Sequence, residues 1–204
     1  MRACIISGGQ VTDYAIIKSL IHNDDTIICA DSGYNHAVKM GINPDILVGD
    51  FDSIGVVPPD VKSLRFPARK DLTDTEIAIE YARDKGFKDF LLLACTGTRM
   101  DHCITNVLLL KGFLERGENA VLQDEHNEIM LTNKKLSFQG APGDIVSLVP
   151  LQTCCGVCTN GLEYPLNEAI LYVGKGLGVS NVMLEETASI SLCEGLLLII
   201  KARD

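Results

Sequence analysis

Acidic side chains that could bind a divalent cation gather in the first part of the chain. The sequence Gly49-Asp50-Phe51-Asp52-Ser53 holds aspartates two positions apart, directly after an apolar segment. From residue 31 to residue 74 every acidic residue is an aspartate: Asp31, Asp45, Asp50, Asp52, Asp60, Asp71 and Asp74. Mg²⁺ binds to proteins through a few carboxylates together with the phosphates of a substrate. The pattern predicts a metal site at Asp50 and Asp52, and a surface turn with solvated carboxylates is the alternative interpretation.

A second acidic segment, Lys70-Asp71-Leu72-Thr73-Asp74, precedes an amphipathic stretch. Thr73 followed by Glu76 predicts a helix over 73–85 that begins with a capping box. Asp71 and Asp74 therefore stand near a helix N-terminus, where the helix dipole stabilises carboxylates. Helix capping could account for one of these acids, but both together exceed what a cap requires.

A loop that could bind phosphate lies at Thr96-Gly97-Thr98-Arg99-Met100-Asp101-His102. A glycine-containing loop that leads into a helix presents backbone N–H groups to phosphate oxygens, and Arg99 can bind such oxygens through two N–H groups. We expect Asp101 to cap the helix and to hold Arg99 or a ribose. His102 shares a helical face with Asn106 and could be a general base or a structural residue.

The elements that must position these residues alternate between strand and helix. Hydrophobic patterning and glycine or proline breaks predict strands at 3–7, 26–30, 45–48, 63–66, 89–94 and 119–122, and helices at 11–22, 35–40, 73–85 and 101–116. This alternation indicates an α/β fold with a largely parallel sheet. Ligands of such sheets bind beyond the carboxyl ends of the strands. Four polar motifs follow such ends: Ser7-Gly8-Gly9, Asp31-Ser32-Gly33, Gly49 to Ser53, and Thr96 to Asp101.

The pattern changes after residue 125. Short segments rich in β-formers follow at 128–131, 136–138, 145–149, 170–173, 188–192 and 196–200. Strands at this spacing predict a small sandwich or barrel. We therefore expect two domains, 1–125 and 126–204.

Composition excludes several classes of protein. The formal net charge of −9 disfavours nucleic-acid binding, and no apolar run approaches the roughly 18 to 20 residues that span a bilayer. The apolar part of the N-terminus is too short for a signal peptide, so we expect a cytoplasmic protein with reduced thiols. Neither a Walker A sequence nor a Gly-x-Gly-x-x-Gly fingerprint is present. Cys155-Gly156-Val157-Cys158 has zinc-like spacing without a second such pair, which favours a packed strand-turn segment over a zinc site.

Taken together, these motifs resemble those of the thiamine pyrophosphokinases. The resemblance rests on Asp31-Ser32-Gly33, Gly49-Asp50-Phe51-Asp52-Ser53, Lys70-Asp71-x-Thr73-Asp74 and Gly97-x-Arg99-x-Asp101-His102-x-x-x-Asn106. It is thinner in the C-terminal half, at Gly161 to Leu166 and Ser180-Asn181. It implies an N-terminal, Rossmann-like α/β catalytic domain that binds ATP and Mg²⁺, followed by a β-sandwich domain that binds thiamine. It also implies a homodimer with sites at the subunit interface, and transfer of the pyrophosphoryl group of ATP to thiamine, which yields thiamine diphosphate and AMP.

The resemblance further implies roles for individual residues. The implied metal ligands are Asp31, Asp50, Asp52 and Asp74. The implied ATP-binding residues are Ser7, Gly8, Asp31, Ser32, Lys70, Thr73, Thr96, Gly97, Arg99, Asp101, His102 and Asn106. The implied catalytic residues are Asp50, Asp52, Asp71, Asp74 and Arg99, with either Asp71 or Asp74 as the proton acceptor. Thiamine would contact Asp74, Tyr164, Ser180 and Asn181; other members often have Trp where this chain has Tyr164.

Two further interpretations remain open at this stage. A magnesium-dependent pyrophosphokinase or nucleotide hydrolase with a different acceptor would need the same metal site. A nucleotide-sensing or metal-sensing module could keep the fold without turnover.

Overall fold

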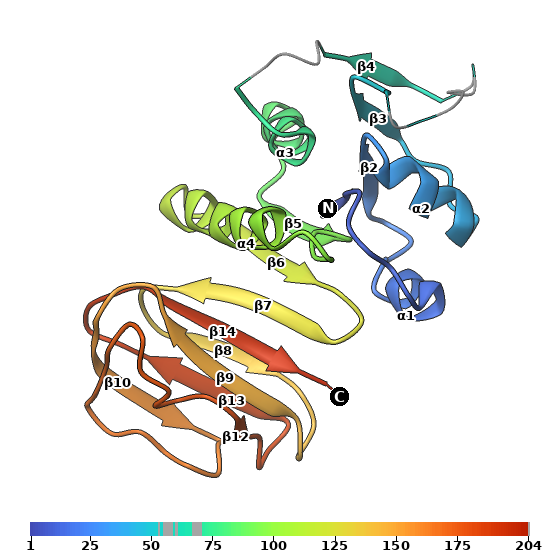
Figure 1. The fold of residues 1–204 in the computed structure, drawn as a ribbon. Helices are drawn as coiled ribbons and strands as arrows, with labels where there is room; N and C mark the ends of the chain where they lie inside the picture. The colour runs from blue at the N-terminus through green and yellow to red at the C-terminus, as the bar shows by residue number, and fades with distance from the viewer. Residues whose placement is uncertain (53, 55–58, 60, 67–70, 204) are drawn as a thin grey trace. The chain divides into compact units, whose positions relative to one another are not determined.

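The N-terminal unit, Met1–Glu125, is built on a parallel sheet covered by helices (Figure 1). The computed structural model describes residues 1–52, 54, 59, 61–66 and 71–203. In this unit the strand order is β6-β5-β1-β2-β3-β4, and each neighbouring pair is parallel. The strands are β1 (Ala3–Ile6), β2 (Thr26–Ala30), β3 (Ile46–Gly49), β4 (Ser63–Arg65), β5 (Asp89–Leu93) and β6 (Asn119–Gln123). The predicted α/β fold with a parallel sheet is confirmed.

The helices are α1 (Tyr14–Ser19), α2 (Gly33–Met40), α3 (Asp74–Asp84) and α4 (Met100–Glu115). Ile17 of α1 and Met40 of α2 join Cys4, Ile6 and Leu47 of the strands in one buried cluster. Because both faces of such a sheet are covered, the strands are continuous apolar runs, and β1 and β3 are buried at every position.

The first helix is shorter than its apolar pattern predicts. The predicted range was 11–22, but α1 begins at Tyr14 and ends at Ser19. The carboxylate of Asp13 accepts hydrogen bonds from the backbone N–H groups of Ala15 and Ile16, which fixes the start of the helix. Ile16, an apolar residue within this range, is 41% exposed, whereas Ile17 is buried.

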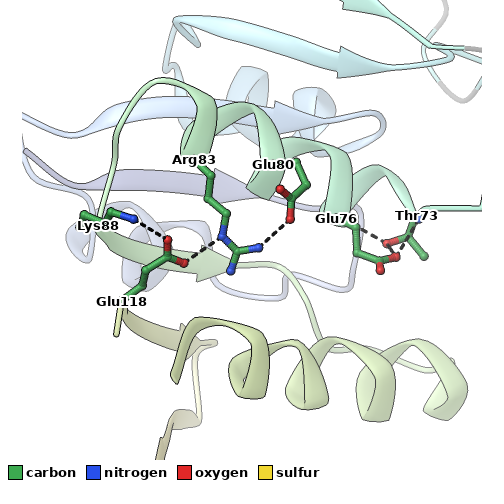
Figure 2. A network of polar contacts seen from close by, with 6 residues as sticks. All are labelled: Thr73, Glu76, Glu80, Arg83, Lys88 and Glu118. Carbon is green, nitrogen blue, oxygen red and sulfur yellow. Dashed lines mark hydrogen bonds and ion pairs between the residues drawn. The ribbon is translucent and has the colours of Figure 1, made fainter. Parts of the chain in front are cut away.

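Helix α3 is held at both ends (Figure 2). At its N-terminus the predicted capping box is confirmed: the Thr73 backbone donates to Glu76 Oε2 at 2.8 Å, and the Glu76 backbone donates to Thr73 Oγ1 at 3.3 Å. Near its C-terminus, Arg83 Nε donates to the buried carboxylate of Glu118 at 2.8 Å, and Lys88 binds the same carboxylate at 3.0 Å. The capping box therefore orders the first turn of α3, which carries Asp74, and the Glu118 carboxylate holds the last turn.

The C-terminal unit, His126–Asp204, is a β-sandwich. Its described residues form antiparallel sheets with the orders β12-β9-β14-β7 and β11-β10-β13-β8. The strands are β7 (Asn127–Thr132), β8 (Leu136–Gln139), β9 (Ile145–Pro150), β10 (Cys154–Asn160), β11 (Ala169–Leu171), β12 (Asn181–Val182), β13 (Thr187–Ser191) and β14 (Leu197–Ala202). Burial alternates along β9 and β13, as expected for strands with one face in the core.

Strands β10 and β12 were not predicted as strands of their own. The Cys155-Gly156-Val157-Cys158 segment lies within β10, in agreement with the packed segment expected there. All eight cysteines of the chain are free thiols. Among the helices that the structure describes, none has the length and apolar character needed to cross a membrane.

Candidate active site

Carboxylates from neighbouring strands converge at one edge of the parallel sheet. Asp31 follows β2, whereas Asp50 and Asp52 follow β3, which pairs with β2. Each of these aspartates offers an oxygen that lies within 4.8 Å of the others. Asp31 is only 7% exposed, Asp50 is half-buried and Asp52 is exposed. The parallel topology thus brings together acids that are about twenty residues apart in the sequence.

Unusual backbone conformations produce this convergence. Asp31 and Phe51 have positive φ angles of 43° and 67°, which are uncommon outside glycine. Gly49 has a φ angle of 150°, and a Cβ atom there would lie 3.0 Å from the Cβ of Asp31. The backbone N–H of Asp52 donates to Asp50 Oδ1 at 3.1 Å and so closes the turn. Strained residues of this kind cluster at functional sites.

The group consists of carboxylate oxygens, which suits a hard divalent cation such as Mg²⁺. Among the described residues, Asp74 falls outside this group, so its role as a metal ligand stays a prediction. Ser53 and Lys70, both part of the predicted motifs, lie outside the described residues.

A cleft of about 810 Å³ opens beside Asp31. Its walls come from the ends of β1, β2 and β5 and from the N-terminal turns of α3 and α4. The predicted residues that line it are Ser7, Gly8, Asp31, Ser32, Thr73, Asp74, Thr96, Gly97, Arg99, His102 and Asn106. Ligand sites of this size are usual for nucleotides and drug-sized molecules.

Glycines allow the turn after β1 to meet the turns after β2 and β5 in the lining of the cleft. A Cβ atom on Gly8 would lie 1.9 Å from Ser32 Oγ, and one on Gly9 would lie 2.2 Å from the carbonyl oxygen of Thr96. The N–H of Gly9 donates to the carbonyl of Ala94 at 2.7 Å, so the turn after β1 is bonded to the turn after β5. Side chains at these glycines would separate the turns and deform the cleft.

Arg99 and Asp101 form an ion pair at the rim of the cleft. Arg99 Nη2 lies 2.5 Å from Asp101 Oδ2, and both side chains are exposed. The hydrogen bond from Arg99 lowers the pKa of Asp101 to about 2. The prediction that Asp101 caps α4 is wrong, because Arg99 occupies the N-cap position and Asp101 lies in the first turn. The prediction that Asp101 holds Arg99 is confirmed.

Other predicted residues hold the loop between β5 and α4. Asn106 is buried, and its Nδ2 donates to the carbonyl of Cys95 at 2.8 Å. Thr96 Oγ1 donates to Asp124 Oδ2 at 2.8 Å. His102 is exposed at the cleft. Asn106 and Thr96 thus fix the loop. The side chains of Arg99 and His102 remain exposed and accessible to a ligand.

Two family models match this chain. "Thiamin pyrophosphokinase, catalytic domain" matches residues 17–122, and "Thiamin pyrophosphokinase, vitamin B1 binding domain" matches residues 128–197. The first match alone covers more than half of the chain. The chain belongs to the thiamin pyrophosphokinase family.

Individual members of the family are similar over the whole chain. The thiamine pyrophosphokinase of Bacillus subtilis (strain 168) is 28% identical, and the alignment covers 98% of each chain. A crystal structure of thiamin pyrophosphokinase from Geobacillus thermodenitrificans has a TM-score of 0.86 at 26% identity and covers 100% of this chain and 98% of that one. The structure from Bacillus subtilis has a TM-score of 0.89 at 23% identity, with both chains fully covered.

Of the residues implied for thiamine, Asp74 belongs to the N-terminal unit, and the other three lie in the C-terminal unit, in the part matched by the second family model. Tyr164 is 62% exposed. Asn181 is buried, and its side chain bonds to both the N–H and the C=O of Tyr164, at 3.0 and 2.7 Å. Ser180 has a φ angle of 58°, and its N–H donates to Ser147 Oγ at 3.0 Å. Asn181 therefore fixes the backbone that presents the Tyr164 ring.

Sequence reasoning missed several residues of the site. Thr75 Oγ1 lies 2.8 Å from Ser7 Oγ and ties α3 to the end of β1. Cys103 of α4 bonds through its sulfur to both the N–H and the C=O of Gly97. His36 Nε2 lies 2.8 Å from the carbonyl oxygen of Gly9. Thr75 could have been found because it follows Asp74 at a helix start, but the other contacts involve backbone atoms, which residue types do not reveal.

Proposed function

We propose that the chain is a thiamine pyrophosphokinase that transfers the pyrophosphoryl group of ATP to thiamine and releases AMP and thiamine diphosphate. Membership of the family supports this reaction. The observation that carries the proposal is the convergence of Asp31, Asp50 and Asp52 beside a cleft that Arg99 borders. Transfer of a pyrophosphoryl group needs this combination. The negative charge on its phosphate oxygens must be neutralised, and the attacking and leaving oxygens must be held in line.

We propose Mg²⁺ as the divalent cation, bound by Asp31, Asp50 and Asp52, with Asp74 as a further ligand or substrate contact. When bound, the cation would neutralise charge on the triphosphate of ATP. The three converging carboxylates hold a negative charge that free ATP would avoid, so they favour ATP as its metal complex.

The walls of the cleft supply groups for the phosphates and the nucleoside. Backbone N–H groups around Gly8 and Gly97, and the hydroxyl groups of Ser7, Ser32, Thr73 and Thr96, can orient phosphate oxygens. Arg99 would bind the transferred group, where its charge stabilises the transition state. The roles of Lys70, Asp101, His102 and Asn106 in ATP binding also belong to this proposal.

The hydroxyl group of thiamine must lose a proton when it attacks. Asp71 and Asp74 are the candidate acceptors. Asp74 lines the cleft and begins α3, whereas Asp71 is exposed and is absent from the described cleft lining. This difference supports Asp74 as the acceptor, in a transition state where deprotonation occurs late.

We propose that thiamine stacks on Tyr164, with Ser180 and Asn181 nearby and the cationic thiazolium ring stabilised by Asp74. An exposed tyrosine with a fixed backbone suits stacking on a flat heterocycle. A homodimer with sites at the subunit interface is part of the proposal. The exposed apolar side chains of the C-terminal unit support it: Tyr164, Ile170, Tyr172, Val173, Leu177, Val179 and Leu184. A cytoplasmic location is also part of the proposal.

Product analysis tests the proposed reaction. The purified chain with ATP, Mg²⁺ and thiamine should form AMP and thiamine diphosphate, and AMP should be absent without thiamine. Formation of ADP, or of AMP without thiamine, would favour a hydrolase or another acceptor instead. Asp52→Asn should lower turnover by about a hundredfold or more, whereas Asp24→Asn, an exposed aspartate elsewhere, should not. A nucleotide-sensing module would bind ATP and show no turnover in either form.

A further inference from the structure

Arg65 contacts the backbone of the turn that carries the proposed metal ligands. Its Nε donates to the carbonyl oxygen of Asp50 at 3.1 Å, and its guanidinium carbon lies 5.7 Å from the ring centroid of Phe51. In the ladder between β3 and β4, Arg65 stands opposite Gly49, and the N–H of Phe66 donates to the Gly49 carbonyl at 2.9 Å. Arg65 at the end of the edge strand β4, together with Phe66, therefore contacts the turn at Gly49, Asp50 and Phe51.

The positive charge of Arg65 beside a proposed cation site is unfavourable for cation binding on electrostatic grounds alone. Like charges repel, so a guanidinium group beside a cation site weakens cation binding unless it contributes in another way. The turn needs support, because Phe51 has a φ angle of 67°, a conformation that costs free energy in a residue with a side chain. Arg65 supplies that support through a hydrogen bond to the Asp50 carbonyl and a cation–π contact with the Phe51 ring.

We infer that Arg65 is a positioning residue that holds the Gly49–Asp52 turn in the conformation where Asp50 and Asp52 converge with Asp31. Arg65 acts through the backbone of Asp50 and the ring of Phe51 and does not itself bind the cation. This inference rests on the metal site of the proposed function. It makes the affinity for a divalent cation depend on a residue whose charge should lower that affinity.

Binding of Mn²⁺ to the purified chain without nucleotide tests the inference, with free Mn²⁺ measured by electron paramagnetic resonance. Arg65→Ala should weaken binding about tenfold, the usual cost of losing a group that orients metal ligands. Arg65→Lys keeps the charge but not the planar donor, so it should fall between Arg65→Ala and the native chain. Arg116→Ala, which removes the same charge from an exposed position at the end of α4, should bind Mn²⁺ as the native chain does.

Equal or tighter Mn²⁺ binding by Arg65→Ala would overturn the inference, because it would show that the guanidinium acts only through its charge or on the phosphates. Arg65→Met keeps an apolar stem over Phe51 and provides the same comparison if Arg65→Ala fails to fold. Thermal unfolding without metal shows whether each variant is folded.

Asp50→Asn separates this inference from the proposed function. If Asp50→Asn loses Mn²⁺ binding while Arg65→Ala keeps it, the metal site stands and only the role of Arg65 is wrong. If the native chain binds no Mn²⁺, or Asp50→Asn binds it equally well, the proposed metal site is wrong and the inference fails with it.

Discussion

His36 Nε2 lies 2.8 Å from the carbonyl oxygen of Gly9, and its Nδ1 lies 2.9 Å from the hydroxyl oxygen of Tyr14. A carbonyl oxygen only accepts hydrogen bonds, so Nε2 carries a proton and donates. Burial lowers the pKa of His36 below its ordinary value, so the ring is neutral at neutral pH and Nδ1 accepts from Tyr14. The imidazole thereby links α1 and α2 to the glycine turn that lines the cleft.

Removal of this imidazole should weaken ATP binding. His36→Ala leaves the Gly9 carbonyl without its donor and should raise KM for ATP about fivefold, with a smaller effect on KM for thiamine. His36→Gln, whose amide can donate to the same carbonyl, should restore part of the loss. Steady-state kinetics with each substrate varied in turn measures both constants. The exposed His22 provides the control, and equal KM values for ATP in His36→Ala and His22→Ala would contradict the role of His36.

The Arg99–Asp101 pair should persist across the working pH range. Because the folded pKa of Asp101 is lowered to about 2, its ion pair is fully formed above the ordinary pKa of an aspartate and is lost only as pH falls through about 2. Asp101→Asn should therefore leave the acid side of the kcat/KM profile unchanged above about pH 5. A shift of that limb in the variant would show that Asp101 titrates during turnover.

Substitution of Arg99 should lower kcat/KM more than substitution of its ion-pair partner Asp101. The Arg99–Asp101 pair is exposed and therefore screened by solvent, so Asp101→Asn should change kcat/KM by no more than about fivefold. Arg99→Ala removes a charge proposed to contact the transferred group and should lower kcat/KM by about a hundredfold or more. Similar losses in the two variants would mean that Arg99 does not contact that group.

Substitution of Tyr164 should change KM for thiamine but not KM for ATP. Tyr164→Ala removes the proposed stacking surface and should raise KM for thiamine about tenfold while KM for ATP stays constant. Asn181→Ala should act in the same direction, because it releases the backbone of Tyr164. Asn133→Ala, at an exposed position in the same unit, is the control for asparagine removal. An unchanged KM for thiamine in Tyr164→Ala would exclude stacking on this ring.

The Glu118 carboxylate should contribute to the decrease in stability of the N-terminal unit at acid pH. Burial alone would raise the pKa of Glu118, but hydrogen bonds from Arg83 and Lys88 outweigh burial and lower it (Figure 2). A lowered folded pKa adds stability above the unfolded pKa, and that stability is lost as pH falls through the folded pKa. Glu118→Gln should therefore destabilise by about 3 kcal/mol at neutral pH and flatten the acid decline of stability.

Denaturant unfolding at several pH values measures this effect. The control is Glu80→Gln, which removes an exposed partner of the same Arg83 and should cost less than about 1 kcal/mol. Equal losses at Glu118 and Glu80 would show that burial of the carboxylate does not matter.

The sequence predicted the cleft because parallel topology fixes where strand ends meet. Asp31, Ser32, Gly97 and Arg99 each follow or lie near a strand end, so the predicted strands place them at one edge of the sheet. The capping box of Thr73 and Glu76 was predictable for a similar reason, since both partners lie within one helical turn.

Contacts made to backbone atoms were not predictable. His36 binds the carbonyl of Gly9, and Arg65 binds that of Asp50. Every residue has a backbone carbonyl group, so the residue types do not indicate which one is bound. Asp101 was expected to cap α4, but the Arg99 guanidinium two residues away competes for its carboxylate. Strand β10 was missed because glycine and cysteines replace the β-branched residues that usually mark a strand.

The fate of the phosphorus atoms of ATP tests the central claim most directly. The chain is incubated with Mg²⁺, thiamine and ATP labelled with ³²P at the α or the β position, and the products are separated. Transfer of an intact pyrophosphoryl group predicts that α label is found only in AMP and that β label is found only in thiamine diphosphate. Formation of thiamine monophosphate as an intermediate, which would be unlabelled if γ-phosphate is transferred stepwise, or β label in ADP, would contradict the account.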